Sequence, residues 1–227
     1  MRWIQKGPEP WSLKRYRNKK DATWDDCPTD VKNDIRDALK AEQGHLCAYC
    51  MRRIQGDGGF QNMKIEHWKP RSKFDEAGDE AGKLDYQNML GVCEGLIDGK
   101  NGKEVICDTK KGGEEITADP RRRDRIETID YQIQNGEGRV KIRSADNAVN
   151  EDLEERLNLN AVRLQENRYK ALSALIQKIS KVKGQGTWPP GLLDSFRRRY
   201  ETPNKDGKLP EYAGFLLWWL NQRRRRT

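Results

Sequence analysis

A histidine lies between two pairs of cysteines in the first half of this chain. Cys47 and Cys50 precede His67, and Cys93 and Cys107 follow it. Cysteine thiolates bind transition metals, and histidine is the side chain best matched to removing a proton from water near neutral pH. The pattern therefore predicts a metal-stapled segment that presents a histidine for acid–base chemistry.

The cysteines predict a structural zinc site. The two residues that separate the cysteines in Cys47-Ala48-Tyr49-Cys50 let both sulfurs reach one tetrahedral ion at about 2.3 Å. This spacing alone also fits a redox motif, but Cys93 and Cys107 would complete a site of four thiolates. The alternative is a set of buried cysteines without a ligand. The fifth cysteine, Cys27, is expected to be a buried or idle thiol.

The segment Ile65-Glu66-His67-Trp68-Lys69-Pro70 holds the candidate catalytic residues. A histidine acting as general base contributes roughly 10²–10⁴-fold to a rate. A carboxylate beside it, such as that of Glu66, can bind Mg²⁺ through oxygen. A single histidine in a strand is more often a packed core residue, but the position of His67 between the cysteine pairs favours the catalytic interpretation.

Two later segments complete a recognisable pattern. Asn88 lies in Asp85-Tyr86-Gln87-Asn88-Met89-Leu90, and Asp108 lies in Cys107-Asp108-Thr109-Lys110-Lys111-Gly112. With the cysteines and His67, these segments resemble the HNH, or ββα-metal, endonucleases over residues 45–113. The resemblance implies an α+β fold with a zinc-stapled ββα-metal core, preceded by an N-terminal arm and helix and followed by a helical C-terminal region.

The resemblance also implies a role for each of these residues. His67 would activate water against a phosphodiester, and Glu66 and Asp108 would bind one catalytic Mg²⁺ or Mn²⁺. Asn88 would orient the His67 loop or complete the site by hydrogen bonding. The residues expected to contact nucleic acid are Lys69, Arg71 and Lys111. The products would carry 5′-phosphate and 3′-hydroxyl ends.

A closer resemblance covers more of the chain. It is carried by the tryptophan-containing arm and by the motifs Cys-Ala-Tyr-Cys, Ile-Glu-His-Trp-Lys-Pro-Arg-Ser, Tyr-Gln-Asn-Met-Leu, Cys-Asp-Thr-Lys-Lys-Gly and Leu157-Asn158-Leu159-Asn160. These motifs are similar to the PtuB-like nuclease subunits of Septu antiphage systems, which also occur as retron-associated effectors. The resemblance implies DNA as substrate and a hetero-oligomer with a PtuA-like ATPase. The chain has no G-x-x-x-x-G-K-[ST] motif, so ATP chemistry would belong to that partner.

Three departures from the HNH pattern bear on the site. Asp108 stands where the family usually has histidine or asparagine, which keeps a good Mg²⁺ ligand there. The insert from Glu94 to Ile106 separates the second cysteine pair, and its Gly, Lys and Asp content suggests a mobile loop that touches DNA or the partner. Adjacent residues of a regular strand point to opposite faces, so the chain must bend for Glu66 and His67 to serve one site.

The elements around these residues can be predicted from their patterns. The segment before residue 29 reads as an extended arm packed by its tryptophans, followed by a helix from Thr29 to about Glu42 that Gly44 ends. Met63 to His67 alternates like a short strand, and Phe74 to Lys83 reads as an acidic surface loop. These assignments give a region 1–44 and a nuclease core 45–116.

The second half of the chain reads as a hairpin followed by helices. Ile126 to Gln134 and Arg139 to Ile142 flank the turn Asn135-Gly136-Glu137-Gly138, within a connector of residues 117–145. A stripe of leucine and isoleucine predicts one long helix from about residue 146 to 182. Shorter helices near 191–200 and 210–224 complete the region 146–227. The aromatic residues of the last helix fit core packing, and docking onto the ATPase is the rival interpretation.

Composition and charge bound the class of protein. The 227 residues are 34% hydrophobic and 35% charged, and 44 basic against 36 acidic residues give a net charge of +8. This excess favours a polyanion such as DNA, although a merely basic surface is the simpler interpretation. No signal peptide or membrane-spanning segment is visible, so a cytoplasmic protein with reduced cysteines is expected.

Four basic clusters are candidate contacts for a phosphate backbone: Lys14 to Lys20, Arg121 to Arg125, Arg197 to Arg199 and Arg223 to Arg226. His45 could bind zinc or phosphate, but a structural surface role is favoured.

Two other functions remain open. One is a stand-alone or restriction-type HNH endonuclease, and the other is a non-catalytic zinc adaptor that binds nucleic acid or protein. The joint presence of Glu66, His67, Asn88 and Asp108 argues against the adaptor.

Overall fold

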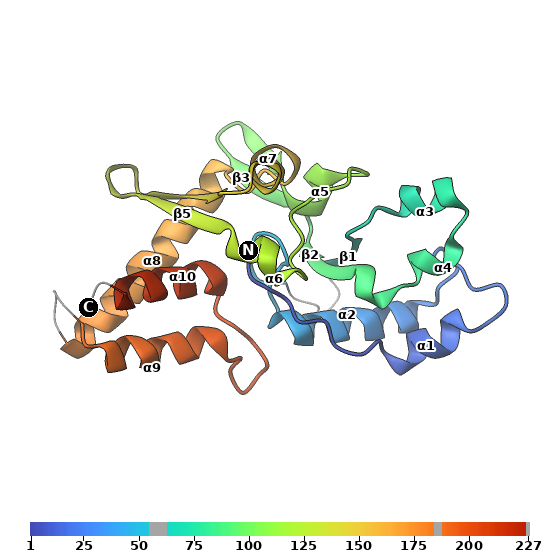
Figure 1. The fold of residues 1–227 in the computed structure, drawn as a ribbon, viewed down its shortest axis with the longest axis horizontal. Helices are drawn as coiled ribbons and strands as arrows, with labels where there is room; N and C mark the ends of the chain where they lie inside the picture. The colour runs from blue at the N-terminus through green and yellow to red at the C-terminus, as the bar shows by residue number, and fades with distance from the viewer. Residues whose placement is uncertain (55–62, 184–187, 226–227) are drawn as a thin grey trace.

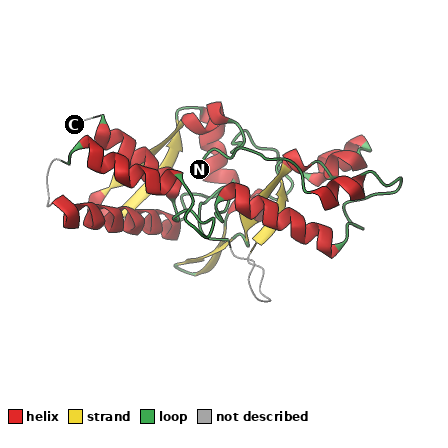
Figure 2. Ribbon diagram, turned by 90° about the horizontal axis from the view of Figure 1, so that it is seen from below, coloured by secondary structure: helices red, strands yellow, loops and turns green. Residues whose placement is uncertain are grey.

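The protein is an elongated α+β molecule in a computed structural model that describes residues 1–54, 63–183 and 188–225 (Figure 1). Helices α1–α4 form one end, and helices α8–α10 with the β5–β6 hairpin form the other. Strands β1 and β2 and helix α5 lie between the two ends. Figure 2 shows that the three pairs of strands are separate and that helices make up most of the fold.

The N-terminal region contains two helices. In α2 (Thr29–Gln43), Val31, Ile35 and Leu39 form the buried stripe, and Gly44 ends the helix at φ 60°. The predicted helix is therefore confirmed. The expectation of a wholly extended arm before residue 29 was wrong, because Trp11–Arg17 forms helix α1, with its buried Leu13 and Tyr16 against the core.

A two-stranded antiparallel sheet lies at the centre. Strand β1 (Met63–His67) pairs with β2 (Met89–Cys93) so that Met63 faces Cys93 and His67 faces Met89. A single turn of 3₁₀ helix, η1 (Tyr86–Asn88), leads into β2. The next helix after the sheet is α5 (Cys107–Lys111). Other elements lie between β1 and β2 and between β2 and α5 along the chain, and the predicted strand Met63–His67 is confirmed.

The long insert between the second pair of cysteines is an ordered hairpin. It forms β3 (Leu96–Gly99) and β4 (Gly102–Val105), which pair antiparallel. The side chain of Asn158 donates to the carbonyl of Val105 at 3.0 Å, and Ile97 is buried. The insert is therefore anchored rather than the loose loop that its composition suggested.

The prediction of an acidic surface loop between β1 and β2 is also wrong, because two short helices form there. Helix α3 (Arg71–Ala77) starts after Pro70, buries Phe74 and ends at Gly78 with φ 65°. Helix α4 (Glu80–Lys83) is capped by the preceding Asp79, whose carboxylate accepts from the backbone N–H of Gly82. Local caps and one aromatic anchor outweigh the acidic composition.

The hairpin in the second half is confirmed with a shifted start. Strands β5 (Ile129–Gln134) and β6 (Arg139–Ser144) pair across η2 (Asn135–Glu137). The residues just before β5 form a helix instead, α6 (Arg123–Glu127).

The predicted long helix is broken into two parts. Helix α7 (Asn147–Glu151) continues as a π-helical turn, η3 (Asp152–Arg156), and α8 begins only at Val162 and runs to Lys183. Between them, Asn158 adopts φ 46°. The side chain of Asn160 pairs with both the N–H and the carbonyl of Ile142 in β6. Tertiary hydrogen bonds thus override a continuous apolar stripe.

The C-terminal helices agree with their predicted positions. They are α9 (Pro190–Glu201) and α10 (Ala213–Arg224), which lie side by side (Figure 1). Phe215 of α10 packs against Tyr131 of β5 with ring centroids 4.8 Å apart. Among the described residues, no helix combines the length and the apolar character needed to cross a membrane.

Candidate active site and metal centre

Four cysteines meet beneath the central sheet. The sulfurs of Cys47, Cys50, Cys93 and Cys107 lie within 4.8 Å of one another and are buried. The Cys47–Cys107 pair is 3.9 Å apart and the Cys50–Cys93 pair is 3.8 Å apart. Four sulfurs at tetrahedral positions around zinc, each about 2.3 Å from the ion, would be about 3.8 Å apart. All five cysteines are free, so this cluster could hold a structural metal such as zinc.

Three different segments position these sulfurs. Cys47 and Cys50 lie on a turn closed by the Met51 N–H, which donates to the carbonyl of Cys47 at 3.1 Å. Cys93 ends β2, and Cys107 begins α5 with its N–H donating to the carbonyl of Leu157. The cluster therefore joins the turn, the sheet, the helix and the break before α8.

An arginine compensates part of the charge of this cluster. A guanidinium nitrogen of Arg52 lies 3.4 Å from the sulfur of Cys93 and also donates to the carbonyl of Leu96. Hydrogen bonds with the other sulfurs, that of Cys107 first, and the charge of Arg52 lower the pKa of the Cys93 thiol. The thiolate form that metals bind is favoured there.

A cleft of about 590 Å³ opens along β1. Glu66 and His67 from β1, Arg71 from α3 and Asp108 from α5 all line it, and Trp24 forms part of its wall. Glu66 and His67 reach one cleft although they are adjacent in the sequence, at the point where the strand ends. The structure thus brings three of the four predicted catalytic residues to one cavity.

The ring of His67 is fixed by two contacts. Its Nε2 lies 2.8 Å from the carbonyl of Lys83, and its ring meets that of Trp24 edge to face at 4.6 Å. A carbonyl can only accept, so Nε2 carries the proton and Nδ1 keeps a free lone pair. Burial lowers the pKa of His67 to about 4. The imidazole is therefore neutral near pH 7 and able to accept a proton.

Glu66 is buried in a polar cage. Its Oε1 accepts from the ammonium of Lys111 at 2.6 Å and from the hydroxyl of Tyr49 at 3.2 Å. Burial first, and then the neighbouring carboxylate of Asp108, raise the pKa of Glu66 to about 8, while Lys111 opposes the rise. Two carboxyl groups therefore lie close together, and Lys111 compensates the charge of Glu66 only in part.

Asp108 supplies the more open of the two carboxylates. It lies in the first turn of α5, and its Oδ2 is 3.8 Å from the ammonium of Lys64. The side chain of Lys64 is largely exposed and also donates to the hydroxyl of Thr109. Asp108 is therefore reachable from the cleft.

Asn88 holds the chain that follows His67. Its side-chain oxygen accepts from the N–H of Lys69 at 2.9 Å, and its side-chain nitrogen donates to the carbonyl of Lys69 at 3.0 Å. The carbonyl of Asn88 accepts from the N–H of Trp68. Asn88 thus makes three hydrogen bonds to the backbone of residues 68–69 and does not line the cleft.

The three residues expected to contact nucleic acid lie in different environments. Arg71 lines the cleft and pairs with Asp25 at 3.0 Å. The ammonium of Lys69 lies 4.7 Å above the ring of Phe74. Lys111 is only 2% exposed and is held by Glu66 and the carbonyl of His67, so its ammonium faces inward rather than toward a phosphate.

Sequence reasoning missed Tyr49, Trp24 and the carbonyl of Lys83 as partners of the site. Tyr49 is fully buried between two metal-ligand candidates, and its hydroxyl reaches from that turn to Glu66. Its place inside the Cys-x-x-Cys turn is the only signal that the sequence offered. His45 is not a member of the four-sulfur cluster.

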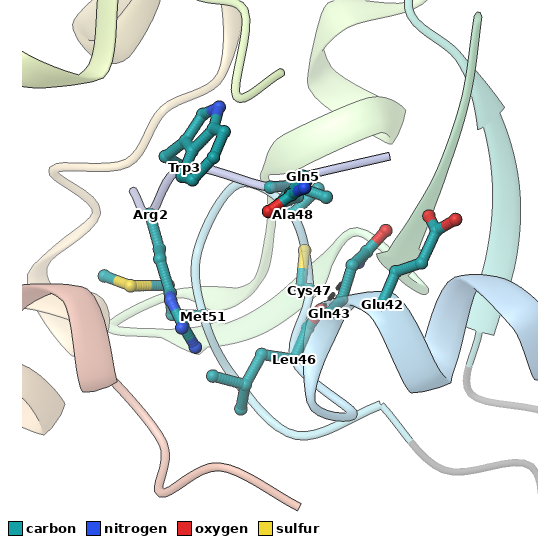
Figure 3. Close-up of a pocket in the computed structure, with 10 residues that line it drawn as sticks. Arg2, Trp3, Gln5, Glu42, Gln43, Leu46, Cys47, Ala48 and Met51 are labelled. Carbon is teal, nitrogen blue, oxygen red and sulfur yellow. Dashed lines mark hydrogen bonds between the residues drawn. The ribbon is translucent and has the colours of Figure 1, made fainter. Parts of the chain in front are cut away.

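A second hollow lies behind the cysteine turn (Figure 3). It is bordered by the arm, including Arg2 and Trp3, by the end of α2 and by Cys47 and Met51. Its volume of about 160 Å³ is below the roughly 300–1,000 Å³ of small-molecule pockets. The hollow is the smaller of the two and none of the predicted catalytic residues lines it, so the larger cleft is the candidate active site.

Comparison with known proteins adds no relative: no protein-family model matches the chain, and no curated protein matches its sequence.

Proposed function

We propose that the protein is a metal-dependent endonuclease of the HNH type that hydrolyses phosphodiester bonds of DNA. One observation carries this proposal: Glu66 and His67 of β1 and Asp108 of α5 line one cleft, and the four-cysteine cluster lies where β2 and α5 meet. A neutral histidine beside two carboxylates is a suitable set of groups for activating water against a phosphate ester.

The donor set fits a divalent cation. Burial, and then the neighbouring carboxylate of Asp108, raise the pKa of Glu66 to about 8, so a bound cation would stabilise the charged form of Glu66. Mg²⁺ is commonly bound by one or two carboxylates and keeps several waters, so these two residues would be enough to hold it. When bound, Mg²⁺ or Mn²⁺ would neutralise the scissile phosphate and the leaving 3′ oxygen.

The chain's own residues would then move the proton. Nδ1 of His67 would take a proton from water while the water oxygen forms a bond to phosphorus and the P–O3′ bond breaks. Trp24 and the carbonyl of Lys83 hold the ring in one orientation for this step. Asn88 fixes the backbone just after His67, and Lys111 and Tyr49 fix Glu66. We assign positioning roles to these three residues.

The proposal also includes DNA as the substrate and an ATPase as the partner. Each of these two parts rests on its own observation. The net charge of +8 favours a polyanion. A PtuA-like ATPase rests on the resemblance to Septu nuclease subunits alone. Copurification with an ATPase encoded beside this protein would support that pairing, and a protein that cleaves fully by itself would support the stand-alone nuclease.

The two carboxylates provide the test of the metal site. We expect Glu66→Gln and Asp108→Asn each to abolish plasmid cleavage in Mg²⁺ or Mn²⁺, because each removes one anionic ligand. Asp98→Asn is the matched control, since Asp98 is an exposed residue of β3 outside the cleft. The assay includes an RNA of the same sequence and, in one arm, the neighbouring ATPase.

Three outcomes are informative. Loss of cleavage in both site variants, with cleavage kept in the control, supports the proposal. If only RNA is cleaved, RNA replaces DNA as the proposed substrate. A folded, zinc-loaded wild type that cleaves neither polymer with or without the ATPase would contradict it and favour the zinc adaptor.

A further inference from the structure

Positive charge is concentrated at the C-terminal end of the molecule, away from the candidate active site. Residues 190–227 contain nine basic and four acidic residues, so most of the chain's excess of +8 lies in this segment. Helices α9 and α10 lie side by side at the end of the molecule opposite to α1–α4 (Figure 1). Nothing in the proposed chemistry uses this end.

The fold brings two separate arginine runs to one cleft of about 610 Å³ between these helices. Arg197 of α9 lines it together with Arg224 and Arg225 from the end of α10. Arg197 pairs with Glu201 at 3.1 Å and Arg224 with Asp194 at 3.2 Å. Arg225 is exposed and has no acidic partner among the described residues. This arginine cleft therefore keeps a net positive charge.

A second cleft, of about 480 Å³, lies on the other side of α10. Trp218, Trp219 and Arg223 of α10 line it, facing Tyr131 and Arg143 of the β5–β6 hairpin. Trp218 is partly exposed and Arg223 lies 5.3 Å from the ring of Trp219. The volume lies within the range of small-molecule sites. Of the three aromatic side chains that line this aromatic cleft, only that of Trp218 is partly exposed, because Tyr131 and Trp219 are buried.

The two clefts share one wall. Asn221 lines the arginine cleft and Gln222, the next residue, lines the aromatic cleft. A chain that crosses the end of α10 would thus meet guanidinium groups on one side and the partly exposed ring of Trp218 on the other. Proteins that bind single strands combine these two features, charge for the backbone and rings for the bases. A base inside a duplex is stacked on its neighbours and has no free face to offer, so the ligand must be single-stranded.

We propose that the end of α10, with its two flanking clefts, binds a single-stranded segment of nucleic acid. Phosphates would occupy the arginine cleft and one base would enter the aromatic cleft. This inference goes beyond the proposed nuclease function, because it needs neither His67 nor a divalent metal.

A binding assay tests the contribution of charge. Fluorescence anisotropy measures how tightly the full chain binds a labelled 12-nucleotide oligothymidylate without added divalent metal. We expect Arg224→Ala/Arg225→Ala to weaken binding and to reduce the slope of log affinity against log salt by about 0.7 per phosphate that these arginines neutralise. Lys170→Ala/Lys178→Ala is the matched control, because both lysines are exposed on α8 and line neither cleft. It should leave the slope unchanged.

An abasic oligomer of the same length tests the base contribution. Wild type should bind oligothymidylate more tightly than the abasic chain by roughly 5- to 150-fold, the effect of one stacked base. Trp218→Ala should remove this preference and Trp218→Phe should keep part of it. Because Trp218 packs near Tyr131, thermal unfolding of both variants is measured in parallel.

Three results would overturn the inference: no preference for the base-containing chain, an equal loss in the lysine control, or displacement of the oligonucleotide by vesicles of anionic lipid. The outcomes remain separable from those of the nuclease proposal. Binding that depends on Arg225 in a protein without cleavage would sustain this surface alone, and cleavage without such binding would sustain the active site alone.

Discussion

Lys111 shows how one buried contact changes the role of a residue. From its place after Cys107 it was expected to contact phosphate, yet its ammonium is 2.6 Å from Oε1 of Glu66 and almost fully buried. The sequence could not reveal this, because it does not show whether a lysine one turn beyond Asp108 points outward or into the core. The pairing of Glu66 with His67 in one cleft was predictable only as a requirement for a bend.

We expect Lys111→Ala to destabilise the protein by about 3 kcal/mol at high pH, because it leaves the carboxylate of Glu66 uncompensated. Lys111 lowers the pKa of Glu66, so its loss raises that pKa further above about 8. The pKa of Glu66 is higher in the folded protein than in the unfolded chain, where it is near 4.5. The protonated carboxyl therefore contributes stability that is fully present below pH 4.5 and is lost as the pH rises through the folded-state pKa. The loss of unfolding free energy caused by Lys111→Ala should therefore be smaller at pH 6 than at pH 9.

Denaturant unfolding of the variant and of wild type at these two pH values measures this effect. Lys110→Ala is the control, since the neighbouring Lys110 is exposed. Equal destabilisation by both substitutions, or a loss of stability that does not depend on pH, would mean that Lys111 does not compensate Glu66.

At the scale of elements, local patterns located most helices and strands but not their interruptions. The helix before Cys47, strand β1, the β5–β6 hairpin and the last two helices follow from periodicity and turn residues. The break between η3 and α8 does not. It depends on hydrogen bonds of Asn160 to β6 and of Leu157 to Cys107, partners that are remote in sequence.

The four-cysteine cluster holds several of these elements together. We expect Cys50→Ser to lose bound zinc and to unfold at a much lower temperature, because the turn, β2 and α5 are then no longer joined through one ion. Cys27→Ser should retain zinc and stability, since Cys27 is buried apart from the cluster. Metal analysis and thermal unfolding provide the readouts. Zinc retention by the Cys50 variant would show that the cluster is not its site.

At the scale of the whole molecule, the N-terminal arm connects the two ends. Its Met1 amino group donates to the hydroxyl of Tyr131 in β5 at 2.9 Å, the N–H of Ile4 donates to the carbonyl of Pro120, and the N–H of Gly7 donates to Glu42 of α2. Composition indicated the basic character, and the family resemblance implied the α+β class, but neither predicted this arrangement. The opposite placement of the candidate active site and the α10 surface likewise emerges only from the fold.

The rate of plasmid cleavage by His67→Ala, in Mn²⁺ and under conditions where the wild type cleaves, tests the central claim most directly. Because Nδ1 of His67 would accept the proton from water, we expect a folded, zinc-loaded variant to lose about 10²–10⁴-fold in rate. His45→Ala, the substitution of the other histidine, should retain cleavage. A His67→Ala protein that cleaves as fast as the wild type would contradict the proposed mechanism.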